Sequence, residues 1–253
     1  MPWELAAKRQ RDIRRRLKSD GTVRVSDLAR HFKVSEETVR RDLKALAAAG
    51  HATIVHGGAV LLALDEPRVE ARPVGRSPEK ARMAVAAARL VAEGATILID
   101  SGASTLHLAR ELRRVRSLTV VTNSLGVATL LARADKCVHM LPGEISLVDE
   151  AALGAETIEA LSNYRFDAAF VCVGGLSGTS GMTDVSRLAA QFRSRLLLAT
   201  DKPYILADSS QFDTETPFPI ANTERVAGLI CDAKPKGSLA RWLAKRRIRL
   251  VLG

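Results

Sequence analysis

Short apolar segments alternate with helix-like segments through residues 79–232, and this alternation constrains the fold more than any other feature of the chain. The almost continuously apolar segments are residues 95–100, 118–123, 136–141, 168–175, 204–208 and 227–232. Helical periodicity predicts helices at residues 79–94, 105–114, 124–134, 153–164 and 186–200. Strands buried on both faces are apolar throughout, so the pattern predicts an α/β domain whose mostly parallel sheet lies between helices.

Small polar residues follow several of these apolar segments, where the predicted strands end. They include Asp100, Gly102, Ser104 and Thr105 in DSGAST, Thr122 and Asn123 in TNSLG, Gly143 and Glu144 in PGEIS, and Asp208 in ADSSQF. The carboxyl ends of parallel strands meet at one edge of the sheet, where such domains bind ligands. Serine and threonine at a helix N-terminus can hold an anion, although they also cap helices without any ligand. Several polar ends on one edge favour a small polar ligand, most simply a phosphorylated one.

Residues 1–62 have a different pattern, in which three short helices precede a hairpin. The helices are predicted within residues 5–21, 26–32 and 36–50. Ser26 and Ser35 are placed to cap the second and the third helix. Two helices joined by a short turn form a helix-turn-helix, whose second helix enters the major groove of DNA.

The third predicted helix has an apolar face and a cationic face. The apolar face consists of Val39, Leu43 and Leu46. The candidate DNA-binding residues at its start and on its remaining surface are Ser35, Glu37, Thr38, Arg40, Arg41 and Lys44. Arginine suits this role because its guanidinium can donate two hydrogen bonds to guanine or to a phosphate. In an isolated helix the same residues would more often form a solvated face, with Asp42 as their ion-pair partner.

Residues 51–62 predict a β-hairpin that turns at Gly57 and Gly58. A hairpin in this place is a wing, so His56, Gly57 and Gly58 are candidate contacts to the DNA backbone. The charge agrees, because residues 1–60 hold 13 Lys and Arg against 7 Asp and Glu, whereas residues 61–232 hold 18 against 21. The N-terminal part is therefore predicted to bind double-stranded DNA.

The segments SEETVRRDLKAL and VHGGAV resemble the winged helix-turn-helix of the DeoR family of bacterial transcriptional regulators. DSGAST, VTNSL, PGE, GMTD and LADSSQF resemble the sensor domain of that family, which is similar in fold to ribose-5-phosphate isomerase and binds sugar phosphates or related metabolites. With the proline-rich and charged residues 63–76 as a linker, the expected domains are a winged helix-turn-helix at 1–62 and a sensor at 77–253. The resemblance implies that the pocket is lined by Asp100, Gly102, Ser104, Thr105, Asn123, Gly143, Glu144 and Asp208.

The chain departs from the family pattern at several pocket positions. Many relatives have a lysine at the position of Ala168 and an acidic residue at that of Ala189, and a lysine is frequent where Gln211 stands. PGE also replaces the commoner Gly-Gly-Glu. A pocket without these groups has lost candidates for charge recognition and for proton transfer, unless Arg187 or Arg193 supplies positive charge.

These patterns predict a homodimeric or homotetrameric repressor of a carbohydrate or polyol operon, which a phosphorylated metabolite releases from its DNA operator. One alternative is a ligand-blind DNA-binding protein whose C-terminal domain only oligomerises. The other is an enzyme similar to a sugar-phosphate isomerase, which would need a base that moves a proton between adjacent carbons. Because the lysine and the acidic residue are absent and a DNA-binding domain is attached, we expect no enzyme activity and no cofactor.

Other classes of protein are not indicated. Cys137, Cys172 and Cys231 lie far apart, without the spacing of a zinc site or a redox pair. No stretch approaches the ~18 apolar residues that span a bilayer, and the N-terminus lacks the apolar core of a signal peptide. We therefore expect a cytoplasmic protein with no metal site and no membrane segment.

The C-terminal tail, residues 233–253, is strongly basic, with 7 Lys and Arg and no acidic residue. An apolar stripe of Leu239, Trp242 and Leu243 predicts a helix that docks on the sensor domain. The cationic residues that follow are expected to form a solvated or oligomer-facing edge.

Overall fold

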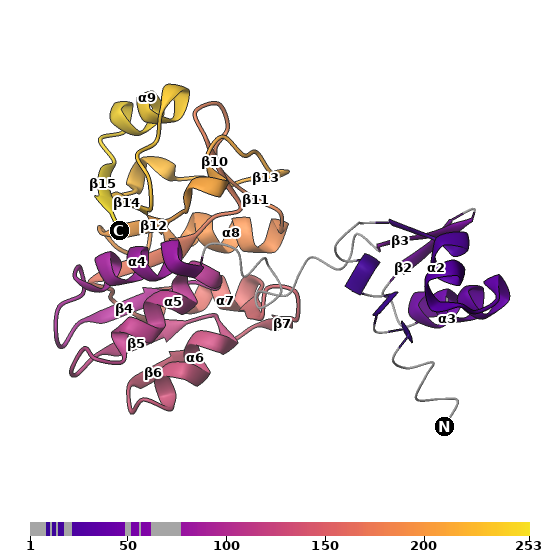
Figure 1. Cartoon of the computed structure of the whole chain (residues 1–253). Coiled ribbons are helices and arrows are strands. Elements are labelled where there is room, and N and C mark those ends of the chain that lie inside the picture. The colour runs from indigo at the N-terminus through magenta and orange to yellow at the C-terminus, as the bar shows by residue number, and fades with distance from the viewer. Residues whose placement is uncertain are drawn as a thin grey trace. The chain divides into compact units, whose positions relative to one another are not determined.

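The structure is a computed structural model, and it describes residues 9–10, 12–13, 15–17, 22–48, 52–55, 57–61 and 77–253. The chain divides into two compact units, Met1–Glu66 and Pro67–Gly253, and each is described by itself (Figure 1). The predicted linker at residues 63–76 lies outside the described residues, and so does His56.

The N-terminal unit is a helix-turn-helix followed by a hairpin (Figure 1). Its elements are β1 (Thr22–Arg24), α2 (Val25–Phe32), α3 (Glu36–Ala48), β2 (Ala52–Val55) and β3 (Gly58–Leu61). The described residues between 9 and 17 are helical as well. The three strands form an antiparallel sheet in the order β1-β3-β2. The winged helix-turn-helix is therefore confirmed, with β1 as a strand that was not predicted.

The core of this unit lies between the helices and the sheet. Its fully or almost fully buried residues include Ile13, Leu17, Leu28, Val39, Leu43 and Leu46. The predicted cap at Ser35 is confirmed, because the Thr38 backbone N–H donates to Ser35 Oγ at 3.2 Å. The cap predicted at Ser26 is wrong. Strand β1 runs directly into α2, so the helix begins at Val25, whose N–H donates to the Gly57 carbonyl at 2.9 Å.

The C-terminal unit is built on a seven-stranded sheet, in the order β15-β14-β12-β9-β4-β5-β6. Its strands are β4 (Thr96–Ile99), β5 (Thr119–Thr122), β6 (Cys137–Met140), β9 (Ala168–Cys172), β12 (Pro203–Leu206), β14 (Gly228–Cys231) and β15 (Arg249–Leu252). All neighbouring strands of this sheet are parallel. The predicted α/β domain with a parallel sheet is confirmed.

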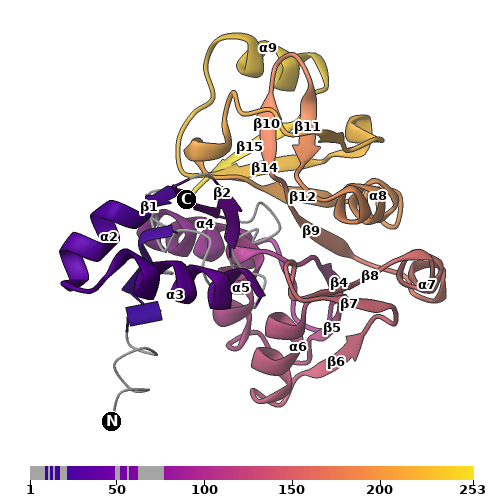
Figure 2. The ribbon, with the colours of Figure 1, turned by 90° about the vertical axis from the view of Figure 1, so that its right-hand side faces the viewer.

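Helices cover both faces of this sheet (Figure 1, Figure 2). They are α4 (Ser77–Ala88), α5 (Ala103–Leu112), α6 (Leu125–Ala132), α7 (Ala155–Ala160), α8 (Arg187–Leu196) and α9 (Gly237–Lys245), with the short 3-10 helices η1 (Leu161–Asn163), η2 (Ser209–Gln211) and η3 (Thr223–Arg225). Successive side chains of a strand point to opposite faces. Accordingly, Ile97 and Ile99 belong to one buried cluster with α4, α5 and α6, and Leu98 belongs to a second with α7, α8 and α9.

Short antiparallel strands were not predicted and add to the parallel sheet. They are β7 (Glu144–Ser146) with β8 (Ala151–Leu153), and β10 (Gly175–Ser177) with β11 (Gly181–Asp184) and β13 (Phe218–Pro219). The predicted tail helix is confirmed as α9, in which Leu239, Trp242 and Leu243 are buried. Strand β15, which pairs with β14, lies in the basic tail and was not predicted.

Candidate functional site

The predicted DNA-binding residues of α3 lie on the side of the helix opposite its core residues. Ser35, Glu37, Arg40, Arg41 and Lys44 are exposed, and Thr38 is half-buried. Arg40 is paired within its own helix, with Nη2 at 2.7 Å from Glu36 Oε2 and Nη1 at 3.7 Å from Glu37 Oε2. Among the described residues, Arg41 and Lys44 have no ion-pair partner, so their charges remain available to a polyanion.

Asp42 does not neutralise this cationic face. Its side chain is buried and accepts a hydrogen bond from Arg9 Nε at 2.5 Å and one from Gln10 Nε2 at 3.0 Å. The carboxylate therefore ties the first helical segment to α3. The structure therefore contradicts the alternative in which Asp42 pairs with the cations of a solvated α3 face.

The two glycines of the wing turn differ in their surroundings. Gly57 is exposed and has a φ of +78°, a conformation that L side chains rarely adopt. Gly58 is buried, and a Cβ at this position would overlap with the Val23 carbonyl. Gly57 is thus suited to the conformation of the turn, and Gly58 allows the hairpin to pack against β1; their contact with DNA stays a prediction.

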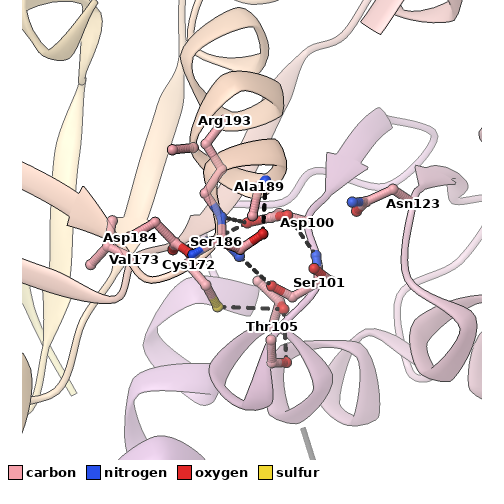
Figure 3. A network of polar contacts seen from close by, with 12 residues as sticks. Asp100, Ser101, Thr105, Asn123, Cys172, Val173, Asp184, Ser186, Ala189 and Arg193 are labelled. Carbon is pink, nitrogen blue, oxygen red and sulfur yellow. Dashed lines mark hydrogen bonds and ion pairs between the residues drawn. The ribbon is translucent and has the colours of Figure 1, made fainter. Parts of the chain in front are cut away.

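Asp100 lies at the carboxyl end of β4, at the centre of a buried polar network (Figure 3). Its Oδ1 accepts the Ser101 N–H at 2.7 Å, and its Oδ2 accepts the Cys172 N–H at 3.1 Å and Arg193 Nε at 2.7 Å. The side chain is fully buried. Burial raises the pKa of Asp100, and the Arg193 guanidinium opposes that shift.

Arg193 reaches this network from α8 and joins three segments of the chain (Figure 3). Its side chain is only 3% exposed. Besides Asp100, it donates to Asp184 Oδ2 at the end of β11 and to the Ser101 carbonyl, the latter at 3.1 Å. Burial alone would lower the pKa of Arg193, but the two carboxylates raise it. The sequence suggested Arg187 and Arg193 as sources of positive charge at the site. Arg193 lies at the carboxyl edge with two carboxylate partners, whereas Arg187 is exposed.

The loop between β4 and α5 is packed tightly against β9. Gly102, the N-cap of α5, has a φ of +149°, and a Cβ there would overlap with Cys172 Sγ. Thr105 Oγ1 donates to the Gly102 carbonyl at 3.0 Å and accepts from Cys172 Sγ at 3.6 Å. The Thr105 hydroxyl is thus already used inside the fold, in a bond back to the carbonyl three residues earlier. Ser104 is buried beside it, without a hydrogen-bond partner for its hydroxyl among the described residues.

The ends of β5 and β6 differ in how fully their polar groups are used. Thr122 Oγ1 donates to the Ile99 carbonyl at 2.6 Å and accepts the Ser124 N–H at 3.0 Å. Asn123 is fully buried and its Nδ2 donates to the Ala152 carbonyl at 3.3 Å, but Oδ1 has no partner (Figure 3). It is the only side-chain nitrogen or oxygen in the part of the chain that the structure describes that is wholly shielded from solvent and has no hydrogen-bond partner. Beyond β6, Gly143 has a φ of +137° and Glu144 is exposed.

Asp208 follows β12 and pairs with a lysine that the sequence did not point to. Lys80 Nζ on α4 lies 2.9 Å from Asp208 Oδ2. Asp208 Oδ1 accepts both the N–H and the hydroxyl of Ser210, and the Asp208 N–H donates to Gln211 Oε1 at 3.0 Å. Burial opposes ionisation, but the hydrogen bonds from Ser210 and the charge of Lys80 outweigh it and lower the pKa of Asp208.

Comparison with known proteins identifies both units. Residues 9–63 match the DeoR-like helix-turn-helix domain, and residues 76–233 match the DeoR C terminal sensor domain. The chain belongs to the DeoR family. It is 27% identical to the glycerol-3-phosphate regulon repressor of Escherichia coli (strain K12), over 93% of this chain and 94% of that protein.

Two further DeoR-family relatives are similar over nearly the same span. The lactose phosphotransferase system repressor of Streptococcus mutans is 31% identical over 92% of this chain and 94% of its own length. The HTH-type transcriptional regulator GolR of Listeria innocua is 33% identical, with 89% and 90% covered. Among solved structures, ribose 5 phosphate isomerase A from Neisseria gonorrhoeae matches 54% of each chain at 18% identity, with a TM-score of 0.40. This DeoR-family chain is a DNA-binding transcriptional regulator with a C-terminal sensor domain.

At three positions where this DeoR-family chain departs from the family pattern, the side chain packs among apolar residues or bonds to the backbone. Ala168 on β9 and Ala189 on α8 are both buried among the apolar residues of the two sensor-domain clusters. Gln211 donates from Nε2 to the Val173 carbonyl, so it joins the end of β12 to the end of β9. No group of three or more His, Cys, Asp or Glu that could hold a metal occurs among the described residues, and none of the helices described there could cross a membrane.

Proposed function

We propose that this regulator is a repressor that holds operator DNA with the exposed face of α3 and the wing. The observation that carries the proposal is the placement of Arg41 and Lys44, which are exposed opposite the buried stripe of α3 and have no ion-pair partner among the described residues. Two cations on a helix of this kind can reach base edges and phosphates of the major groove. The relatives named above as repressors support repression over activation.

The ligand that we propose is a small phosphorylated metabolite bound at the carboxyl edge of the sensor sheet. Asn123 supports this site, because a buried amide oxygen without a partner costs free energy that a ligand hydroxyl or N–H would recover. The Ser104 hydroxyl at the start of α5 is a second polar group there without a hydrogen bond to the described residues. A glycerol-3-phosphate regulon repressor among the relatives supports a phosphorylated compound of carbohydrate or polyol metabolism.

The two alternatives are weaker. A ligand-blind domain is favoured by the apolar surroundings of Ala189 and by the full use of the Thr105 hydroxyl, but it leaves Asn123 Oδ1 unexplained. Ala168 is the first residue of β9, so it lies at the opposite edge of the sheet and does not bear on this site. An isomerase needs a carboxylate free to take up a proton, whereas Asp100 accepts three hydrogen bonds, one of them from Arg193. We therefore propose a regulator without enzyme activity. We also propose that the regulator is a homo-oligomer, because two copies of the DNA-binding unit would match a two-fold operator. A protein that binds operator DNA would act in the cytoplasm.

One experiment tests DNA binding and ligand binding together. DNA that the purified full chain selects from a random-sequence pool is labelled, and its release is followed by fluorescence anisotropy against a panel of phosphorylated sugars and polyols. We expect one compound to release the DNA from the wild-type chain and to have no effect on Asn123→Ala, which should still bind the DNA. Selection of no DNA would refute the regulator, and DNA that no compound releases would favour the ligand-blind alternative.

A further inference from the structure

The C-terminal tail gives the sensor domain a surface of positive charge with no acidic residue to balance it. Residues 233–253 hold 7 Lys and Arg and no Asp or Glu, whereas residues 61–232 hold 18 Lys and Arg against 21 Asp and Glu. All seven cations lack an ion-pair partner among the described residues, and all but Arg246 are exposed. These seven residues form the basic tail surface: Lys234, Lys236, Arg241, Lys245, Arg246, Arg247 and Arg249.

Helix α9 directs its cations outward because the core uses its apolar side. Leu239, Trp242 and Leu243 are buried in the cluster that also contains residues of α7 and α8. Arg241 and Lys245 are four residues apart, so they lie on the same side of the helix, and both are exposed. The helix itself lies at the periphery of the sensor domain (Figure 1, Figure 2). Packing of the apolar stripe therefore fixes a row of cations that faces solvent.

The positive charge continues beyond α9 into strand β15. The Arg246 guanidinium lies 4.2 Å from the centre of the Trp242 ring, which holds it at the end of the helix. Arg247 and Arg249 are exposed, and Arg249 begins β15, which is the last strand in the order of the parallel sheet. The cations of α9 and β15 thus project from regular elements of the folded domain, whose positions are set by packing and by backbone pairing.

A lipid surface and a single-stranded nucleic acid both require side chains that this surface lacks. The exposed residues of α9 other than its cations and Gly237 are small, namely Ser238 and Ala244. A helix that lies in a membrane surface inserts large apolar residues, and the exposed Leu250 and Leu252 belong to a strand instead. Single strands stack their bases on aromatic rings, but Trp242, the only aromatic residue of the tail, is 8% exposed. Positive charge alone is what the phosphates of a duplex require.

We propose that the basic tail surface is a second DNA-binding surface, which contacts phosphates of the duplex beside the site held by α3. The inference rests on the proposed function, because the DNA-binding unit raises the local concentration of duplex for the sensor domain of the same chain. The nine residues of α9 are about 14 Å long, and duplex DNA carries about eight phosphate charges over that length. Phosphate contacts carry no sequence information. The tail therefore adds affinity for any duplex, while α3 and the wing select the sequence.

Titrations at several salt concentrations test the tail. In the tail variant of the full chain, Lys236→Gln, Arg241→Gln and Lys245→Gln remove three exposed cations. Fluorescence anisotropy follows its binding to the selected site, extended on each side by about three helical turns or roughly 30 base pairs, and to an unselected duplex of equal length. Each phosphate contact contributes about 0.9 to the slope of log affinity against log salt, so we expect a slope less steep by about two to three. Affinity should fall by the same factor on both duplexes.

A matched control variant removes the same charge elsewhere on the sensor domain. Arg113→Gln, Arg133→Gln and Arg165→Gln replace three exposed arginines that also have no ion-pair partner among the described residues. The slope of this control should stay within about 0.5 of wild type. A wild-type slope in the tail variant overturns the inference, and so does an equal change of slope in the control. Circular dichroism verifies the fold of both variants.

Sedimentation velocity distinguishes a DNA-binding surface from an interface between copies. A two-fold contact through the tail would place the same cations of two copies against each other, which like charge opposes. We expect the tail variant to keep the oligomeric state of wild type. A tail variant that loses that state together with its salt dependence would make the tail an interface between copies and overturn the inference.

The two duplexes separate this inference from the proposed function. Arg41→Ala on α3 should reduce the preference for the selected duplex, whereas the tail variant should leave that preference unchanged. If the wild-type chain selects no sequence, the proposed function fails, and the unselected duplex still tests the tail. Selection of a sequence with an unchanged slope in the tail variant gives the reverse result. Binding of neither duplex refutes both.

Discussion

Replacement of Arg193 by leucine should destabilise the sensor domain more than any other single change at the carboxyl edge. The guanidinium lies between Asp100 and Asp184, both almost fully buried, and also donates to the Ser101 carbonyl. Leucine fills much of the same volume but leaves two carboxylates without their cation. Removing one partner of a buried ion pair costs about 3–5 kcal/mol, and the upper half of that range applies here because two carboxylates lose their partner.

The destabilisation should depend on pH, with a sign set by Asp100. Burial raises the pKa of Asp100, and Arg193 is the first of the influences that oppose this shift. In Arg193→Leu the pKa of the folded state therefore rises further above the ordinary value of about 4. The folded variant then binds its proton more readily than the unfolded chain, so its stability falls as pH increases through the raised pKa. The difference from wild type should therefore be smaller at acidic pH than at neutral pH.

Urea-induced unfolding of the full chain measures this difference. Trp242 on α9 reports on the sensor domain when Trp3 is replaced by phenylalanine in all samples. At pH 7 we expect Arg193→Leu to lose about 4 kcal/mol of unfolding free energy, a large part of the 5–15 kcal/mol that domains typically have. Arg195→Leu, an exposed position on the same helix, should change it by less than about 0.5 kcal/mol. A loss below about 1 kcal/mol, or one equal at pH 4 and pH 7, would refute the reasoning.

Two further changes test the DNA-binding face and the loop after β4. Arg41→Ala should weaken binding of the selected DNA by about 1–3 kcal/mol and make its dependence on salt less steep, measured by anisotropy titrations at several salt concentrations; unchanged binding would remove α3 from the groove. Gly102→Ala should lower the thermal unfolding midpoint of the sensor domain, because its φ is +149° and its Cβ would overlap with Cys172 Sγ. Adding Cys172→Ala should restore part of the midpoint, and a single variant as stable as wild type would contradict the described packing.

The local sequence pattern was sufficient to predict the elements whose apolar residues form a continuous run or a helical stripe. The strands β4, β5, β9, β12 and β14 of the parallel sheet are mostly apolar because helices cover both faces, and that burial is visible in the sequence, whereas the edge strand β6 is partly exposed. The apolar stripe of α3 likewise fixed which of its side chains would be exposed. Strand β15 escaped prediction because its outer side is uncovered: Leu250 and Leu252 are exposed, and its neighbours in the sequence are cationic.

The contacts within the candidate site were less predictable, because they join residues that are distant in the chain. Asp100 and Arg193 were both recognised as candidates, yet nothing in the sequence pairs them across 93 positions. Lys80 was not recognised, since a lysine in the first turn of a helix has no unusual local context. The sequence could assign hydroxyls such as that of Thr105 to a ligand or to a cap, and the contact with the Gly102 carbonyl shows instead that this hydroxyl bonds back to the helix backbone.

The two cations of the carboxyl edge differ in how readily they can respond to an anion. Arg193 has two carboxylate partners and a carbonyl, and it is 3% exposed, so an anion would have to displace three contacts to reach it. Lys80 has one carboxylate partner and is 15% exposed. Because desolvation and the loss of partners both oppose movement of Arg193, Lys80 is the cation that gives way first.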